Sequence, residues 1–145
     1  MTTRRALLLA VPALGFAKVV QAAPAPVMLY KNPECDCCEG YAAYLRKRGF
    51  TVTVKASNDL AEISRKAGIP PELEGCHTAF IGNYVVDGHV PVEVVNKLLA
   101  ERPAIKGITL PGMPAGSPGM TGRKSGPFTI YAVGQDGRAT VYMTI

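Results

Sequence analysis

Four cysteines are the residues of this 145-residue chain with the most distinctive chemistry. Cys35, Cys37 and Cys38 lie almost side by side in the sequence, and the fourth is Cys76. Thiolates act as nucleophiles and redox groups, and they bind copper(I), zinc and iron–sulfur clusters. In an exported domain, cysteines also pair in structural disulfides. The cluster therefore indicates one of three uses: a redox pair, a metal site or structural bridges.

Pairing all four cysteines in structural disulfides is geometrically unfavourable. A bridge between Cys37 and Cys38 would join Cα atoms that a trans peptide holds ~3.8 Å apart, whereas disulfides usually span roughly 4.4 to 6.8 Å. The other two connectivities each join one of these neighbours to Cys35 and the other to Cys76. Both would crowd two bridges into one small patch, although a single structural bridge would not.

Cys35 and Cys38 alone form a C-x-x-C pair between a predicted strand and a predicted helix. A thiol at a helix N-terminus is acidified by the exposed amides and the helix dipole, which makes it a better nucleophile. Three carboxylates, those of Glu34, Asp36 and Glu39, surround these thiols in the sequence. Their charge opposes thiolate formation but favours a bound cation, so the local electrostatics favour a metal site.

Five further candidate ligands lie later in the chain: Cys76, His77, His89, Met113 and Met120. The two methionines lie in a Gly/Pro-rich segment, 107–127, on no periodic apolar face. Thiolate with thioether is a soft ligand set that selects copper(I), while packing in a core or lid is the alternative role of the methionines. For His89 the alternatives to ligation are a pH-sensitive group beside the ligands and a solvated loop residue.

The elements that must position these residues alternate between strands and helices. The apolar periodicity and the Gly, Pro and capping signals predict strands at 27–30, 50–55, 79–81, 84–86, 128–133 and 138–145, and helices at 36–48, 59–67 and 91–103. The cysteines thus open the first helix, and a hairpin closes the chain. The order indicates an α/β domain with a central mixed sheet and flanking helices, in which buried tyrosines such as Tyr41 place their hydroxyls at the rim of the core.

The first residues carry the pattern of an export signal. Arg4 and Arg5 precede an apolar run, 6–16, which is shorter than the roughly 20 residues of a membrane-spanning helix. A cleavage site after Ala22 predicts a leader at 1–22 and a mature domain at 23–145. Removal of the leader would leave 13 basic against 11 acidic residues, so nucleic acid is not an expected partner. We expect a periplasmic protein without a permanent membrane anchor, exported by the Sec or the twin-arginine route.

Five sequence blocks, in order, resemble the CopG-type family of exported copper-resistance proteins. They are Tyr30-Lys31 ahead of Cys35-Asp36-Cys37-Cys38, then Cys76-His77-Thr78-Ala79, Asp87-Gly88-His89-Val90-Pro91, Leu99-Ala100-Glu101-Arg102-Pro103, and Pro111-Gly112-Met113-Pro114 through Met120. The resemblance runs from 29 to about 120. It implies a thioredoxin-like fold, copper binding by the C-x-C-C cysteines and the later cysteine as a multinuclear cluster, and a role in copper redox conversion.

The chain departs from true thioredoxins, which carry Trp before a C-G-P-C motif and a cis-proline ahead of the third strand. It has no Trp, and Cys76-His77-Thr78 occupies the stretch where that proline would be expected. This substitution would face Cys76 toward the other three sulfurs.

We therefore expect an exported protein that buffers copper or changes its oxidation state, with copper ions and other periplasmic copper-handling proteins as partners. Its copper(I) ligands would be Cys35, Cys37, Cys38 and Cys76, completed or shielded by Met113, Met120, His77 or His89. One alternative is a thiol–disulfide oxidoreductase acting on proteins, with Cys35 as nucleophile and Cys38 as resolver. Another is a binding module stabilised by zinc or by disulfides.

Overall fold

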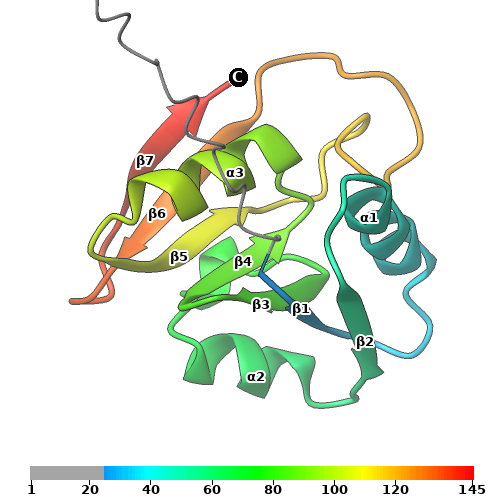
Figure 1. The fold of residues 1–145 in the computed structure, drawn as a ribbon, viewed down its shortest axis with the longest axis horizontal. Coiled ribbons are helices and arrows are strands. Elements are labelled where there is room, and N and C mark those ends of the chain that lie inside the picture. The colour runs from blue at the N-terminus through cyan, green and yellow to red at the C-terminus, as the bar shows by residue number, and fades with distance from the viewer. Residues whose placement is uncertain (1–24) are drawn as a thin grey trace, which may run out of the picture.

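The computed structural model describes residues 25–145, which build one mixed sheet with helices on both faces (Figure 1). In chain order the elements are β1 (Val27–Lys31), α1 (Asp36–Lys47), β2 (Val52–Ala56), α2 (Leu60–Lys66), the 3-10 helix η1 (Pro71–Leu73), β3 (His77–Ile81), β4 (Tyr84–Gly88), α3 (Val92–Glu101), β5 (Ile105–Leu110), β6 (Thr129–Gly134) and β7 (Ala139–Thr144). The predicted α/β class and mixed sheet are confirmed. The leader expected at 1–22 lies outside the described residues.

The seven strands of the described chain follow the order β2-β1-β3-β4-β5-β6-β7. β1 pairs in parallel with β2, and β4 with β5, while the other neighbours are antiparallel. Parallel neighbours need a crossover connection, and α1 and α3 provide these two crossovers. Because β1 and β3 are neighbours, Lys31 at the end of β1 faces His77 at the start of β3.

The main core lies between the sheet and the two crossover helices. It contains alternate residues of β1 (Val27 and Leu29) together with Tyr41 and Leu45 of α1 and Leu98 of α3. A smaller cluster, which includes Ile69, Leu73, Val85 and Val133, covers the opposite face, the face on which α2 packs. The alternation within β1, β3 and β4 decides which side chains reach each core.

Helix α1 begins at the cysteines because a turn delivers the chain to that point. The Cys35 N–H donates to the carbonyl of Asn32 at 3.1 Å, and Cys35 is the N-cap residue. Gly49, with φ of 90°, follows the helix and allows the chain to reverse toward β2. Cys37 and Cys38 therefore lie in the first turn, as the sequence predicted.

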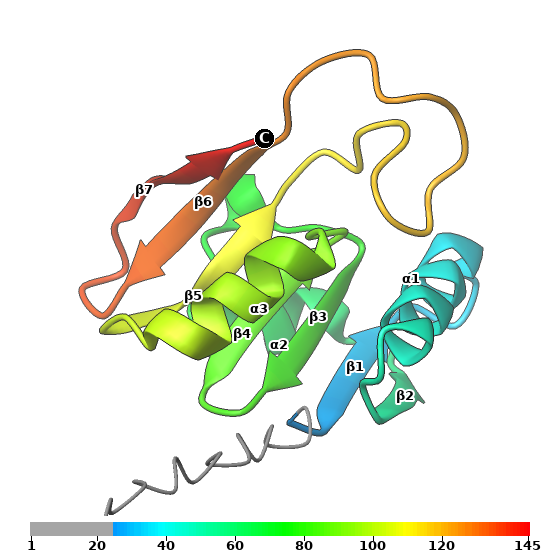
Figure 2. The same cartoon turned by 45° about the horizontal axis from the view of Figure 1, so that its top comes forward.

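The long segment between β5 and β6 arches over to α1 before it returns to the sheet (Figure 2). It touches the helix backbone to backbone: a Cβ placed on Gly119 would lie 2.4 Å from the Tyr41 nitrogen. A Cβ on Gly40 would likewise lie 2.8 Å from the Gly119 carbonyl oxygen. Two glycines thus bring the methionine-bearing loop against the helix that carries the cysteines.

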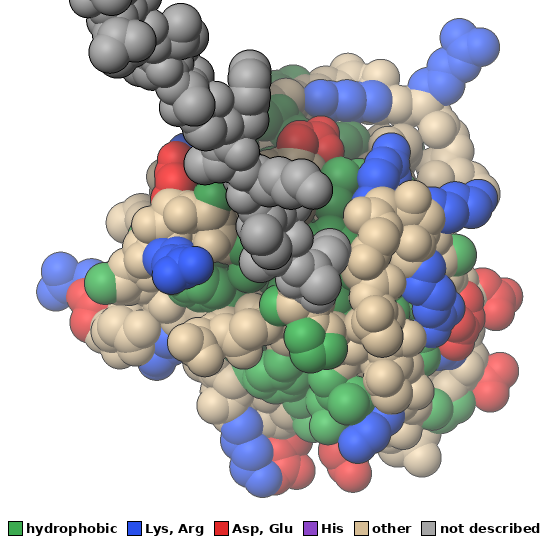
Figure 3. Space-filling model, in the orientation of Figure 1, with side chains coloured by type: hydrophobic (Ala, Val, Ile, Leu, Met, Phe, Trp, Pro, Cys, Tyr) green, Lys and Arg blue, Asp and Glu red, His purple; other side chains and the backbone are tan. Residues whose placement is uncertain are grey.

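Acidic and basic side chains are both distributed around the visible face of the molecule, and no histidine is seen there (Figure 3). Both histidines are fully buried. Among the helices described, none has the length and apolar character that crossing a membrane requires.

Candidate metal-binding site

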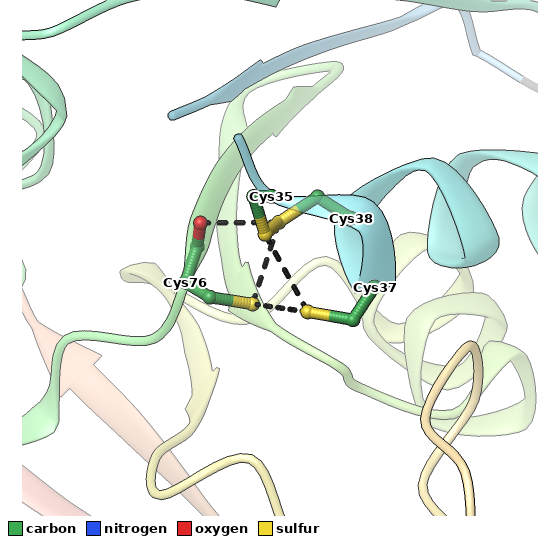
Figure 4. A group of neighbouring side chains, drawn as sticks. All are labelled: Cys35, Cys37, Cys38 and Cys76. Carbon is green, nitrogen blue, oxygen red and sulfur yellow. Dashed lines mark hydrogen bonds between the residues drawn. A yellow bond between two sulfur atoms is a disulfide. The ribbon is translucent and has the colours of Figure 1, made fainter. Parts of the chain in front are cut away.

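Four sulfur atoms from two distant parts of the chain converge at the N-terminus of α1 (Figure 4). Cys35 and Cys38 form a disulfide, and the Cys37 Sγ lies 3.4 Å from that of Cys35. The Cys76 Sγ lies 3.6 Å from the Cys37 Sγ and 3.5 Å from the Cys38 Sγ. The expected convergence of Cys76 with the other three cysteines is therefore present.

The sheet explains why residues so far apart in sequence meet here. β1 leads through a short turn into α1, and Cys76 immediately precedes β3. Because these strands are antiparallel neighbours, the end of β1 and the start of β3 lie at the same edge of the sheet. The first turn of α1 and Cys76 are consequently held face to face by backbone pairing.

The structure contains one disulfide among these cysteines, and Cys37 and Cys76 are free thiols. The vicinal Cys37–Cys38 bridge that geometry disfavours is not formed. Within the described chain the full structural pairing is thus not observed, and two thiols remain for chemistry. Reduction of the Cys35–Cys38 bridge would add two more thiols to the same patch.

Both histidines lie beside Cys76. The Cys76 Sγ is 2.9 Å from His89 Nε2 and 3.5 Å from His77 Nδ1. His89 Nδ1 lies 2.6 Å from the Pro118 carbonyl oxygen, which only accepts hydrogen bonds, so this nitrogen carries the proton. The unprotonated Nε2 then faces the sulfur with its lone pair, which is the orientation of a metal-ligating imidazole.

Burial determines the protonation states of Cys76, His77 and His89. It lowers the pKa of His77 to about 3, with a further contribution from the neighbouring His89, and it lowers the pKa of His89 against the opposing effect of the Pro118 hydrogen bond. Both imidazoles are therefore neutral near pH 7 and able to ligate. Burial and the adjacent Cys37 raise the pKa of Cys76 to about 12, so a metal ion binding there would displace the thiol proton.

Of the three roles expected for His89, the solvated loop residue is wrong. Its side chain is 0 % exposed because the loop after β5 covers it through Pro118. Pro118 is 29 residues away in the sequence, so the local composition around His89 gave no signal of this cover.

Tyr41 forms the inner wall of the site. Its ring stacks on His77 at 4.5 Å between ring centroids and meets His89 edge-on at 5.5 Å. Its hydroxyl donates to the Val90 carbonyl at 2.8 Å, and burial raises the pKa of this phenol far above its usual range. Tyr41 is a core residue as predicted, but its hydroxyl is bonded inside the molecule rather than placed at the rim.

Met113 and Met120 lie in the loop that covers His89. Met113 is 43 % exposed and has a positive φ of 45°, and Met120 is half-buried. Contacts of Pro118 with His89 and of Gly119 with α1 hold this loop at the site. Ligation by the two thioethers stays a prediction.

Two buried polar residues near the site, Lys31 and Asp87, lie in the sequence blocks that resemble the CopG-type family, but no role was predicted for them from the sequence. Lys31 is 6 % exposed at the end of β1, on the inward side with Val27 and Leu29, and this alternation was an available signal. Asp87 in β4 accepts hydrogen bonds from the Gly75 amide and the Thr78 hydroxyl. Burial raises the pKa of Asp87 to about 6.

The fold and the site define a mixed α/β protein with a cluster of cysteines and histidines suited to a metal ion. A family model described as "Protein of unknown function, DUF411" matches residues 73–120. Two solved structures titled "Copper resistance protein copG", Form 1 and Form 2, are 32 % identical in sequence, with TM-scores of 0.77 and 0.78. Each match covers 84 % of this chain and 98 % of the other. No curated protein sequence matches the chain.

The chain belongs to the CopG-type copper-resistance family. The matched residues 73–120 include Cys76, both histidines and both candidate methionines.

Proposed function

We propose that this protein is an exported copper-binding protein that sequesters copper(I) or converts it to and from copper(II), and so contributes to copper resistance. The observation that carries the proposal is the convergence of four sulfurs, one of which, that of Cys76, also lies beside two neutral imidazoles. The copper-resistance titles of the two similar structures support copper as the metal.

The donor set favours copper(I) over harder ions. Thiolates and imidazoles bind copper and zinc, whereas carboxylate and carbonyl oxygens suit calcium and magnesium. Cys35, Cys37, Cys38 and Cys76 would hold the copper, and a set of four thiolates can bridge several ions as a multinuclear cluster. His77 and His89 would complete the site from inside, and Met113 and Met120 would close or shield it from the loop.

The Cys35–Cys38 pair supplies the redox step of the proposal. Two copper(II) ions would each take one electron, the two thiols would lose two protons and form one disulfide, and two copper(I) ions would result. The Cys35–Cys38 disulfide would be the oxidised form of the pair in this reaction. An external dithiol reductant would restore the two thiols.

The thioredoxin-like fold, the domain limits and the location are part of the same proposal. The partial strand order β2-β1-β3-β4, with α1 and α3 against one core, supports the thioredoxin-like fold. A disulfide persists in oxidising compartments such as the periplasm, which supports export. The leader at 1–22 and the mature domain at 23–145 rest on the sequence pattern. Other periplasmic copper-handling proteins would deliver or receive the ion.

Thiol–disulfide exchange with proteins is the second candidate function. It is favoured by the Cys35–Cys38 disulfide at the N-terminus of α1, in which Cys38 is buried and Cys35 is partly accessible. Cys35 would be the attacking thiol and Cys38 the resolving one. This function would need neither Cys76 nor the methionine loop.

A copper(I) titration separates the two functions. The fully reduced mature domain is titrated anaerobically against a chromophoric copper(I) chelator, beside a variant with all four cysteines changed to Ser. We expect the natural sequence to withdraw copper from the chelator and the variant to leave it bound. Equal competition by both proteins would overturn the proposal, and insulin reduction that is lost in Cys35→Ala but kept in Cys76→Ser would establish the second function instead.

A further inference from the structure

A buried lysine lies directly beneath the cysteine turn. Lys31 is the last residue of β1 and points to the core side of the sheet with Val27 and Leu29. Burying an ammonium group is costly unless hydrogen bonds or opposite charges compensate it. A strand residue on the core side would ordinarily be apolar. The contacts of the ammonium group therefore indicate what Lys31 contributes to the protein.

The ammonium group binds the backbone of the turn that presents Cys35. Lys31 Nζ donates to the carbonyl oxygens of Asn32 at 3.3 Å, Pro33 at 3.1 Å and Cys35 at 3.3 Å. It also lies 3.4 Å from Glu39 Oε1, in a side chain that is 53 % exposed. Three carbonyl dipoles satisfy the donors, but the one carboxylate partner is screened by solvent. The positive charge beneath the turn is therefore only partly cancelled.

The position of this charge is unfavourable for the helix alone. The N-terminus of α1 already carries the positive end of the helix dipole, and a cation there lowers helix stability. The combination of an ammonium group and free helix amides instead favours an anion. Glu34, Asp36 and Glu39 are exposed at the same end, so the less solvated electron-rich groups near this charge are the sulfurs of the cysteine turn.

We propose that Lys31 is a positioning residue of the cysteine site: it fixes the 32–35 turn and holds a positive charge beneath Cys35 that favours the reduced Cys35–Cys38 pair over its disulfide. The copper part of this inference rests on the proposed function, because copper(I) bound by several thiolates carries excess negative charge that the ammonium group offsets. The disulfide equilibrium does not depend on copper and tests Lys31 separately.

The test uses three substitutions of Lys31 and one control. Lys31→Met removes the charge and the donors, Lys31→Gln removes the charge but keeps an amide donor, and Lys31→Arg keeps both. Lys47→Met is the control, since Lys47 is an exposed lysine in the last turn of α1, at the end of the helix away from the cysteines. Each protein is equilibrated in glutathione buffers, and the reduced fractions of Cys35 and Cys38 are read by alkylation and peptide mass.

We expect Lys31→Met and Lys31→Gln to lower the equilibrium constant for reduction about tenfold, which is about 30 mV for this two-electron couple. Lys31→Arg and Lys47→Met should match the natural sequence. An unchanged equilibrium in Lys31→Gln, or an equal shift in Lys47→Met, would overturn the role of the charge. If Lys31→Met does not fold, the comparison of Gln with Arg still decides the question.

The same set is then titrated with copper(I) against the chelator. We expect the two neutral variants to bind copper about tenfold more weakly, a loss that becomes smaller at high salt because screening weakens charge interactions. If the natural sequence does not bind copper at all, the proposed function fails while the disulfide result stands. If it binds copper and the neutral variants bind it equally well, the copper part of the inference is overturned.

Discussion

The imidazole of His89 connects Cys76 to the loop between β5 and β6: its Nε2 lies 2.9 Å from the Cys76 Sγ, and its Nδ1 lies 2.6 Å from the Pro118 carbonyl oxygen. One side chain thus joins the sulfur cluster to its cover. The bond to Pro118 fixes both the tautomer and the ring orientation, as a carbonyl partner does for many metal-ligating histidines. A change in the position of the loop would therefore move the candidate ligand nitrogen of His89 relative to Cys76.

Replacing His89 should weaken copper(I) binding. His89→Ala removes the nitrogen that faces Cys76, and we expect at least about a tenfold loss of affinity, since even the partners of metal ligands are worth 10- to 100-fold. Competition with a chelator measures this loss. Thermal unfolding of the metal-free variant is the control for general damage, and an unchanged affinity in a folded variant would exclude His89 as a ligand.

Reductant should double the number of reactive thiols. Protein isolated with its disulfide and then unfolded in denaturant should show two reactive thiols, those of Cys37 and Cys76. After treatment with a dithiol and its removal, it should give four. We expect the copper(I) capacity to rise with this change, because two further soft ligands become available in the same patch. A capacity that is the same in both states would show that Cys35 and Cys38 do not hold copper.

Most of the local elements could be predicted from the sequence, whereas the environment of the site could not. Alternating apolar residues and the glycine and proline signals identified the α-helices and six of the described strands, but not β5 (Ile105–Leu110), which overlaps the Gly/Pro-rich segment. The convergence of Cys76 on the first turn of α1 was implied by the family resemblance. The cover of His89 by Pro118 and the wall formed by Tyr41 depend on contacts between distant segments, which periodicity does not encode. The redox state of the Cys35–Cys38 pair was also left open, because the spacing fits thiols and a disulfide equally well.

The stability of the metal-free protein should depend on pH through groups with opposite signs: the pKa values of His77 and His89 are lowered by burial, and that of Asp87 is raised. The pKa of His77 is about 3 in the folded state and about 6.5 in the unfolded chain, so between these values the unfolded chain holds more protons and stability falls as the pH falls. The pKa of Asp87 is about 6 in the folded state and about 3.9 in the unfolded chain. Between these values the folded state holds more protons, so this contribution to stability rises as the pH falls.

The two contributions oppose each other between about pH 4 and pH 6. Asp87→Asn should therefore make acid destabilisation steeper: His77 contributes up to about 1.4 kcal/mol per pH unit, and His89 acts in the same direction. His77→Gln should make it shallower than in the natural sequence. Urea unfolding across this pH range gives the slopes. Identical slopes in all three proteins would contradict the assignment of these groups.

Two glycines of the covering loop provide a matched test of how it is held on the helix. Gly119 and Gly112 have similar positive φ values, 81° and 78°. A Cβ at Gly119 would lie 2.4 Å from the Tyr41 nitrogen, whereas a Cβ at Gly112 would have nothing within 4 Å. Gly112→Ala should cost only the backbone strain of about 1 to 2 kcal/mol.

Gly119→Ala should cost about 1 to 3 kcal/mol more, because the helix backbone cannot yield as a flexible side chain would. It should also weaken copper(I) binding, since the adjacent Pro118 would move away from His89, while Gly112→Ala should bind copper as the natural sequence does. Chemical unfolding and chelator competition measure the two effects. Equal losses of stability in both variants would mean that the loop does not rest on α1 in solution, and its proposed role as the cover of the site would then be untenable.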